Sequence, residues 1–345
     1  MIAAMKFRAL WIMILFSVLF ALTLLGSLCL GSVPIGLHDV AAVLLQKAGI
    51  SADNADKTTA IIVWQLRLPR TLLAGLAGAV LGTAGAVLQG LFRNPLADPY
   101  SLGLSSGASI GAVGAITLGW HFRVALFAAV PSAAFVGAIF SAVLVYGISR
   151  ANKRASPTIA LLLAGTAVGA FLSALVSLIV SLNDKDLHIV FFWLLGGFGG
   201  KSWADLASVL MPAGLAIAGA QFLARPLDVL GAGEETAGTL GINLQRLRSG
   251  AVIIASLGAA SAVSAGGVIG FIGLLGPHMA RLFVGPLHRR LIPASALTGA
   301  VLLMLADAVA RWIAAPLELP VGVITALIGA PLFLRLLTTG QEVRS

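Results

Sequence analysis

The sequence has little charge, a single cysteine and few aromatic residues. Only 10% of its 345 residues are charged, against about one quarter in an average soluble domain, while 59% are hydrophobic. This balance excludes an ordinary water-soluble protein. The one cysteine, Cys29, excludes an intrachain disulfide framework and a cysteine-built metal site. With aromatics at 7% and 40 glycines, the apolar side chains are mostly small and aliphatic, which suits helices that pack closely in lipid.

Long uncharged runs dominate the sequence, and a helix needs about 20 apolar residues to cross the hydrocarbon core. The run 249–280 is too long for one span, and Gly266-Gly267 offers a break within it. Residues 187–200 are too short to cross, so we expect a re-entrant or surface helix there. The sequence therefore predicts one all-α polytopic membrane domain over 1–345, with ten spans in 9–30, 71–92, 99–122, 124–149, 155–183, 206–224, the two halves of 249–280, 291–306 and 319–334.

The distribution of basic residues predicts the orientation of the chain. Lys6 and Arg8 precede the first run, but its 22 uncharged residues exceed the roughly 7–15 of a signal-peptide core, so we interpret it as a permanent span. With the N-terminus inside, 14 of the 22 basic residues fall on the inner side, as the positive-inside rule requires. Ten spans then return the C-terminus to the cytoplasm. The net charge of +9 follows from this loop bias, so no nucleic-acid partner is expected.

The spans contain few groups that could perform chemistry. Gly200-Lys201-Ser202 resembles the end of a phosphate-binding loop, but Leu195 stands where that motif needs its first glycine. Asp307 and Arg311 are spaced i, i+4, which favours an ion pair on one helix face over a proton relay. The histidines lack metal-ligand spacing, and for His278 we favour a helix-packing hydrogen bond over a haem or substrate contact. We expect no catalytic residues, no metal site and no cofactor on this chain.

Several segments in collinear order resemble one known family. They are WQLRLPRTLLAGLAGAVLGTAGAVLQGLFRNPLADPYSLGLSSG at 64–107, ALLLAGTAVG at 160–169, FWLLGGFGGKSW at 192–203, and GGVIGFIGLLGPHMARLF and LLMLADAVARWIAAPLELPVGVITALIGAPLF within 266–333. These strongly resemble the permease subunits of bacterial type II ABC importers for ferric siderophores, haem and cobalamin. The resemblance implies a multi-pass inner-membrane protein that translocates an iron chelate or cobalamin.

The resemblance also implies partners. These are a second permease chain (a homodimer being favoured over a paralogous pair), two cytoplasmic ATPase subunits that carry ATP and Mg, and an extracytoplasmic binding protein. The rival hypothesis is an ion-coupled secondary transporter, which needs ion sites near mid-membrane, and only Asp307 is a candidate.

Family positions can be transferred where this sequence matches the motifs. Arg67 and Arg70 of LRLPR and Arg311 of ADAVAR correspond to arginines at the outer mouth that pair with acids of the binding protein. The alternative for each is interfacial snorkelling, and for Arg311 also the pair with Asp307. The resemblance assigns an inner gate to the turn at Asn94-Pro95-Leu96 and to Thr158. Pro157 departs from the hydroxyl-rich sequence that the family has beside Thr158.

Two further assignments concern ATPase coupling and the translocation pathway. The inner loop 224–249 contains GEETAGTLG, which resembles the motif that docks on the ATPase. We expect two short helical turns in this loop, with Ala237 small enough for close docking. The fifth and tenth predicted spans should line the translocation pathway, the tenth with residues 321–330. The residues assigned are Gly233, Glu234, Ala237, Leu240 and Gly241 for coupling, and Ala164, Gly165 and Thr166 for the pathway.

Overall fold

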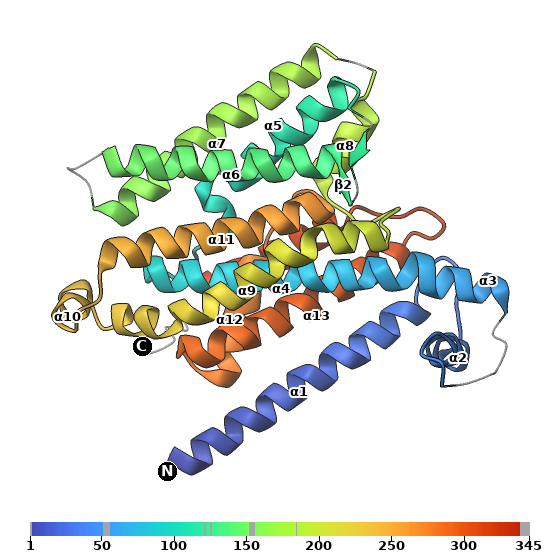
Figure 1. The fold of residues 1–345 in the computed structure, drawn as a ribbon, viewed down its shortest axis with the longest axis horizontal. Helices are drawn as coiled ribbons and strands as arrows, with labels where there is room; N and C mark the ends of the chain where they lie inside the picture. The colour runs from blue at the N-terminus through green and yellow to red at the C-terminus, as the bar shows by residue number, and fades with distance from the viewer. Residues whose placement is uncertain are drawn as a thin grey trace.

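The computed structural model describes residues 2–50, 56–120, 122–124, 126–151, 156–183 and 185–338, and it is built almost entirely of helices (Figure 1). Within these residues, seven helices are long and apolar enough to cross a membrane, and three shorter ones, in α5, α12 and α14, are also apolar. The elements are α1 Ile2–Cys29, α2 Leu37–Lys47, α3 Lys57–Ala60, η1 Ile61–Arg67, α4 Leu68–Phe92, η2 Pro99–Leu102, α5 Leu104–Thr117, β1 Arg123–Val124, β2 Phe127–Ala128, α6 Ala129–Ala151, α7 Pro157–Ser181, α8 Leu187–Leu195, α9 Trp203–Gly231, α10 Glu234–Thr239, α11 Leu244–Gly266, α12 Ile272–Val284, α13 His288–Trp312 and α14 Val321–Thr338.

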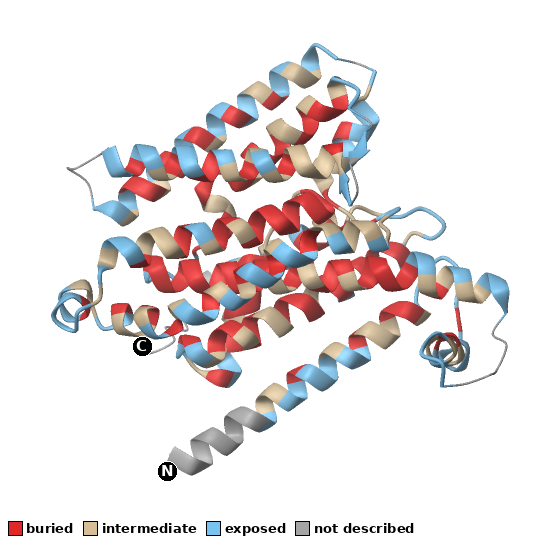
Figure 2. Ribbon diagram, viewed as in Figure 1, coloured by how far each residue is buried: buried red, intermediate tan, exposed pale blue. Residues whose placement is uncertain are grey.

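Helix α4 forms the centre of the bundle. It lies against α9, α11, α12 and α13, and nearly all of its side chains are buried (Figure 2). Glycines permit this close packing: a Cβ on Gly78 would overlap the carbonyl of Gly299, and one on Gly85 would overlap that of Gly273. Because the bilayer supplies no hydrophobic drive between helices, such close backbone approach is a main source of their association.

Helices α5, α6 and α7 form a second layer against α11 and η2 (Figure 1). Helix α1 crosses the opposite side and contacts α13. The outward faces of α1, α6 and α7 carry many exposed residues (Figure 2). Both ends of the described chain lie at the end of the bundle where α10 projects, opposite α2 and α8. The positive-inside rule makes the α10 end the cytoplasmic, or inner, end.

Local sequence signals set the helix boundaries. Ser156 accepts a hydrogen bond from the Ile159 N–H and is followed by Pro157 at the first helical position, so α7 begins there. Asn243 caps α11 in the same way. Gly267 has a φ of +72°, which ends α11 and begins the predicted break in the long run 249–280.

The ten apolar helices confirm the predicted all-α polytopic fold, and α8 confirms a short helix within 187–200. Some boundaries were wrong. The second span begins earlier, because α3 and the π-helix η1 continue into α4. The third is shorter, because η2 occupies its expected start and α5 ends at Thr117. The fourth begins later, because the β1–β2 hairpin precedes α6. The expected loop 224–249 contains one helix, α10, because α9 continues through Pro226 to Gly231.

Candidate functional site

A buried network of charges joins α4 to α13 near the outer end of the bundle. The Arg70 guanidinium donates to both carboxylate oxygens of Asp307, with Nη2 and Nε at 2.9 and 3.0 Å from Oδ1. Its Nη1 donates to Glu318 at 2.7 Å. Arg311 pairs with the other side of Asp307, with Nε at 3.1 Å from Oδ2. Asp307 is fully buried, so it is compensated by two cations rather than left alone.

The remaining donors of the outer arginines bind the end of α1. Arg311 donates to the Ser27 hydroxyl at 2.7 Å and to the Leu30 carbonyl at 3.1 Å. Arg67 donates to the carbonyls of Leu28 at 2.7 Å and Cys29 at 3.2 Å, and also to that of Val33. The last carbonyls of a helix have no intrahelical partner. The two arginines therefore cap α1 and fix its outer end against α4 and α13.

These contacts confirm the i, i+4 pair of Asp307 with Arg311. They also show which internal bonds the arginines would have to release in order to bind another protein. Arg67, Arg70 and Arg311 are only 6, 8 and 4% exposed, and each guanidinium is bonded inside the chain. The snorkelling alternative does not describe them, because their partners are protein groups rather than lipid phosphates. Docking of all three on a binding protein stays a prediction. Of their two acidic partners, Asp307 is fully buried and Glu318, whose side chain is 45% exposed, is the one open to exchange.

The predicted inner gate turn lies at the opposite end of the bundle. Arg93 ends α4 with a φ of +49°, and the Asn94 side chain accepts a hydrogen bond from the Leu96 N–H at 2.9 Å. Pro95 lies between them, and this Asx-type turn is exposed. Asp98 follows and caps η2 through the Tyr100 N–H at 2.8 Å. Burial raises the pKa of the Asp98 carboxyl to about 6, although this hydrogen bond opposes the shift.

The first turn of α7 carries the other predicted gate residue. Thr158 follows Pro157 directly and is half-buried. The proline occupies a position where its missing N–H costs nothing, so it shapes the helix start without disturbing Thr158. The gating role of Thr158 and of the Asn94 turn stays a prediction.

The predicted pathway residues on α7 point in different directions. Ala164 is 7% exposed and Gly165 is buried, because a Cβ on Gly165 would overlap the Ser101 carbonyl of η2. Both residues therefore pack within this chain, and the assignment of these two to the pathway surface needs correction. Thr166 is exposed on the outward face of α7. On α14, Val321 is buried while Leu327 is 68% exposed, so only part of 321–330 faces outward.

The predicted coupling segment forms a compact projection at the inner end. Gly233 precedes α10 with a φ of +119°, and Glu234 pairs with Arg248 at 2.7 Å, so its carboxylate has a partner within the chain. Ala237 is fully buried, which contradicts its expected role as an outward docking contact; its small size instead fits the interior of the loop. The exposed apolar side chain is Leu240, 65% exposed and followed by Gly241 with a φ of +80°.

Three polar contacts at the inner end are not predicted by the sequence. His288 donates its backbone N–H to Asp228 at 2.7 Å, and its Nδ1 lies 2.7 Å from the same oxygen. Arg281 donates to Gln89 at 3.0 Å. No sequence spacing pairs residues 60 or 192 positions apart, so only the fold could reveal them. His278 makes no side-chain hydrogen bond within the described residues, so the expected packing bond is not found.

The described part of the chain shows no cluster of three metal-ligating side chains. It also places Gly200-Lys201-Ser202 in a loop between α8 and α9, without the strand that a phosphate-binding loop follows.

Comparison with known proteins identifies the family. The model of the FecCD transport family matches residues 18–339. The chain is 46% identical over 289 residues to the cobalamin import system permease protein BtuC of Halobacterium salinarum, covering 84% of this chain and 76% of that protein. It is 37% identical over 286 residues to the Fe(3+)-citrate import system permease protein YfmD of Bacillus subtilis, covering 82% and 83%. A solved structure described as an inward-facing metal-chelate type ABC transporter matches with a TM-score of 0.82 and 32% identity, over 95% of this chain and 99% of that one. The chain is therefore a multi-pass membrane permease that belongs to the FecCD transport family.

Proposed function

We propose that this chain is the permease subunit of a binding-protein-dependent ABC importer that moves cobalamin or a ferric chelate across a bacterial inner membrane. The observation that carries the proposal is its 46% identity to a cobalamin permease over 84% of the chain. The likeness to a ferric-citrate permease supports the wider substrate class.

The inner-end projection supports coupling to a separate ATPase. Helix α10 lies beyond the ends of α9 and α11 (Figure 1). Exposed Leu240 can enter an apolar groove, and the Glu234–Arg248 pair fixes α10 against α11. A rigid, preorganised contact loses little conformational freedom on binding. ATP and Mg would bind on the ATPase subunits, and this chain would provide no catalytic group.

The exposed faces of α7 and α14 support a second permease chain as partner. Thr166 on α7 and Leu327 on α14 lie on outward faces of helices that are otherwise packed into the bundle. Two copies related by a two-fold axis would bring the same faces together, as in most homo-oligomers, and would enclose a pathway between them.

Reconstituted transport tests the proposal. The permease would be combined in proteoliposomes with candidate ATPase subunits and with binding proteins loaded with cobalamin or ferric citrate. We expect ATP-dependent uptake of one of these solutes and stimulation of ATP hydrolysis by the loaded binding protein. Uptake driven by an ion gradient without ATP would instead establish the secondary-transporter alternative, in which Asp307 would have to bind an ion while already held by Arg70 and Arg311.

A further inference from the structure

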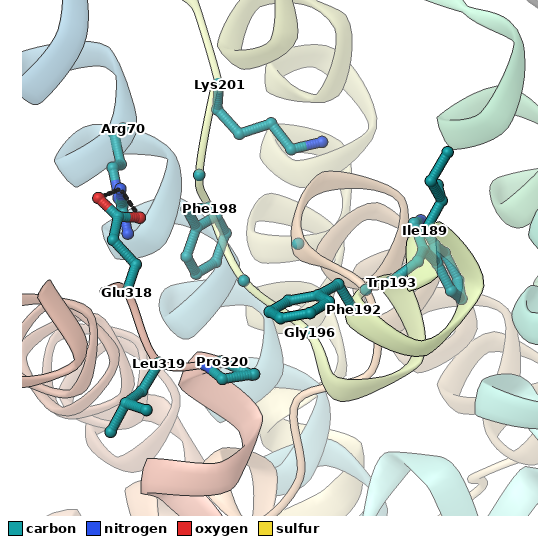
Figure 3. Close-up of a pocket in the computed structure, with 14 residues that line it drawn as sticks. Arg70, Ile189, Phe192, Trp193, Gly196, Phe198, Lys201, Glu318, Leu319 and Pro320 are labelled. Atoms are coloured by element: carbon teal, nitrogen blue, oxygen red, sulfur yellow. Dashed lines mark hydrogen bonds and ion pairs between the residues drawn. The ribbon is translucent and has the colours of Figure 1, made fainter. Parts of the chain in front are cut away.

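A pocket opens at the outer end of the bundle between α8, the glycine-rich loop 196–201, the turn after α11 and the segment before α14 (Figure 3). Its volume of about 370 Å³ is at the lower end of the range for small-molecule sites. It is therefore large enough for a small ligand or for one end of a large one. Of its lining residues, only Arg70 and Glu318 belong to the charge network described above.

Lys201 supplies this pocket with a cation that has no bonded partner among the described residues. The side chain is half-buried, and its amine makes no hydrogen bond or ion pair with any residue that the structure describes. The acid in the next turn, Asp205, is already engaged: it pairs with Arg123 at 3.0 Å and accepts from the Ser202 hydroxyl at 2.6 Å. Burial lowers the pKa of the Lys201 amine, with the charge of Asp205 opposing that shift.

The other charged groups of the pocket neutralise each other. Arg70 holds Glu318 at 2.7 Å, so this carboxylate is neutralised within the chain. In Figure 3 Lys201 extends away from the Arg70–Glu318 pair, toward the side of the pocket where Ile189 and Trp193 lie. The three charged groups that line the pocket therefore sum to one positive charge, on Lys201.

The rest of the lining is apolar and partly aromatic. Phe192 and Trp193 of α8, Phe198, Leu319 and Pro320 form the walls (Figure 3). An ammonium group without a bonded partner is unfavourable beside such walls, because apolar side chains replace part of its hydration shell. A ligand with one anionic group and an apolar body would remove that penalty and cover the aromatic surface.

We propose that the pocket is an outer binding site for a carboxylate-bearing solute, with Lys201 binding the carboxylate and Phe192, Trp193 and Pro320 contacting the apolar body. The proposal deepens the importer function and rests on it: the site would hold one acidic edge of the transported chelate as it enters from outside. It implies that this permease distinguishes solutes by a peripheral carboxylate.

Chemical protection of Lys201 tests the site without any transport. The permease in nanodiscs of uncharged phosphatidylcholine would be acetylated with a water-soluble amine reagent, and the rate at each lysine followed by mass spectrometry. We expect 3-phenylpropionate to slow acetylation of Lys201 about fivefold at about four times its dissociation constant, as simple occupancy requires. The exposed Lys185 in the same outer region should be unaffected, and 3-phenylpropionamide should protect neither residue.

Two outcomes would overturn the proposal. One is unchanged labelling of Lys201 up to the solubility limit of the acid. The other is protection by phosphatidylglycerol in the nanodisc but not by the free acid, which would make this a lipid-phosphate site. A failure of the importer function would appear separately, as absent ATP-dependent uptake with Lys201 still protected.

A kinetic test separates recognition from folding. In proteoliposomes, Lys201→Gln should raise the KM for a carboxylate-bearing chelate while leaving the maximal rate and the KM for an uncharged chelate unchanged, and Lys201→Arg should restore most of the affinity. Lys185→Gln is the matched control and should behave as wild type. An equal loss for charged and uncharged chelates would show that Lys201 is only structural.

Discussion

Arg70 of α4 and Asp307 of α13, which lie 237 positions apart in the sequence, form an ion pair with two hydrogen bonds. The Nη2 and Nε atoms of Arg70 lie 2.9 and 3.0 Å from Oδ1 of Asp307. The pair connects the central helix to its most extensive neighbour. Through Glu318 it also holds the segment that leads into α14. One buried carboxylate and one guanidinium thus fix three elements at the outer end of the bundle.

Removal of the buried carboxylate should strongly destabilise the fold. Asp307→Ala leaves Arg70 and Arg311 close together without their shared anion, and breaking a buried pair typically costs about 3–5 kcal/mol. We expect a large drop in the thermal unfolding midpoint of the purified permease. Glu318→Gln is the control: it removes a half-exposed carboxylate and should cost about 1 kcal/mol or less. Equal effects of both changes would contradict the network described here.

The close packing of α4 against α12 leads to a second prediction. Gly85→Ala places a methyl group against the Gly273 carbonyl, so α4 and α12 would have to separate. Overpacking of this kind costs about 1–3 kcal/mol or more. Gly147 of α6 is the matched control, because a Cβ there meets nothing within 4 Å. Gly147→Ala should be neutral or slightly stabilising, since alanine favours helix. Equal thermal midpoints for the two variants would be incompatible with the close α4–α12 contact.

Much of the fold could be predicted from the sequence, because a membrane span is recognised by length and absence of charge alone. The break at Gly266-Gly267 and the turn at Asn94-Pro95 were also visible, since glycine and proline act locally. The run of α9 through Pro226 was not, because neighbouring groups can compensate for the hydrogen bond that proline removes in a membrane helix.

The site was harder to predict than the spans. The sequence around an arginine at the end of a span does not show whether the side chain faces lipid, a partner protein or a buried acid. The partners of Arg67 are backbone carbonyls, which no sequence motif encodes. Ala237 shows the same limit: its small size was correctly associated with close packing, but the sequence does not say that the packing is internal.

Asp98 predicts a pH dependence of stability. Its pKa in the folded chain, about 6, is above its ordinary value of 3.8, so the folded state binds this proton more tightly than the unfolded state. The stabilisation is complete below the ordinary pKa and is lost as the pH rises through about 6. Asp98→Asn keeps an oxygen acceptor for the Tyr100 N–H but cannot ionise.

We therefore expect the asparagine variant to be more stable than wild type at pH 7.5, by about 1 kcal/mol after allowing for solvent screening. The two proteins should converge near pH 4. The difference between their thermal midpoints, measured across this range, isolates Asp98 from the other titrating groups. A difference that is independent of pH would show that the Asp98 carboxyl is already ionised throughout.

Cysteine labelling tests the orientation. In a Cys29→Ser background, a cysteine at exposed Glu235 should react with an impermeant thiol reagent only when the inner side is accessible. A cysteine at exposed Asp39 in α2 should react from outside. Position 54, farther along the same outer segment, lies outside the described residues. Reversed labelling would overturn the orientation and every inner or outer assignment made from it.

The coupling loop makes the last prediction. Leu240 is 65% exposed at the end of α10, so Leu240→Ser should leave the fold intact. If this leucine fills a groove on an ATPase subunit, losing it removes about 2 kcal/mol or more of burial. We expect the ATPase to be lost on copurification and transport to fall at least tenfold, since 1.4 kcal/mol already changes affinity tenfold. Leu287→Ser is the control, because Leu287 is 50% exposed at the same end but outside the loop.

Ala237→Trp is not a suitable alternative to Leu240→Ser. Ala237 is fully buried, so a tryptophan there would disrupt α10 itself before testing any contact with a partner. Retention of the ATPase by the Leu240→Ser permease would remove Leu240 from the interface and leave the exposed polar face of α10 as the remaining contact.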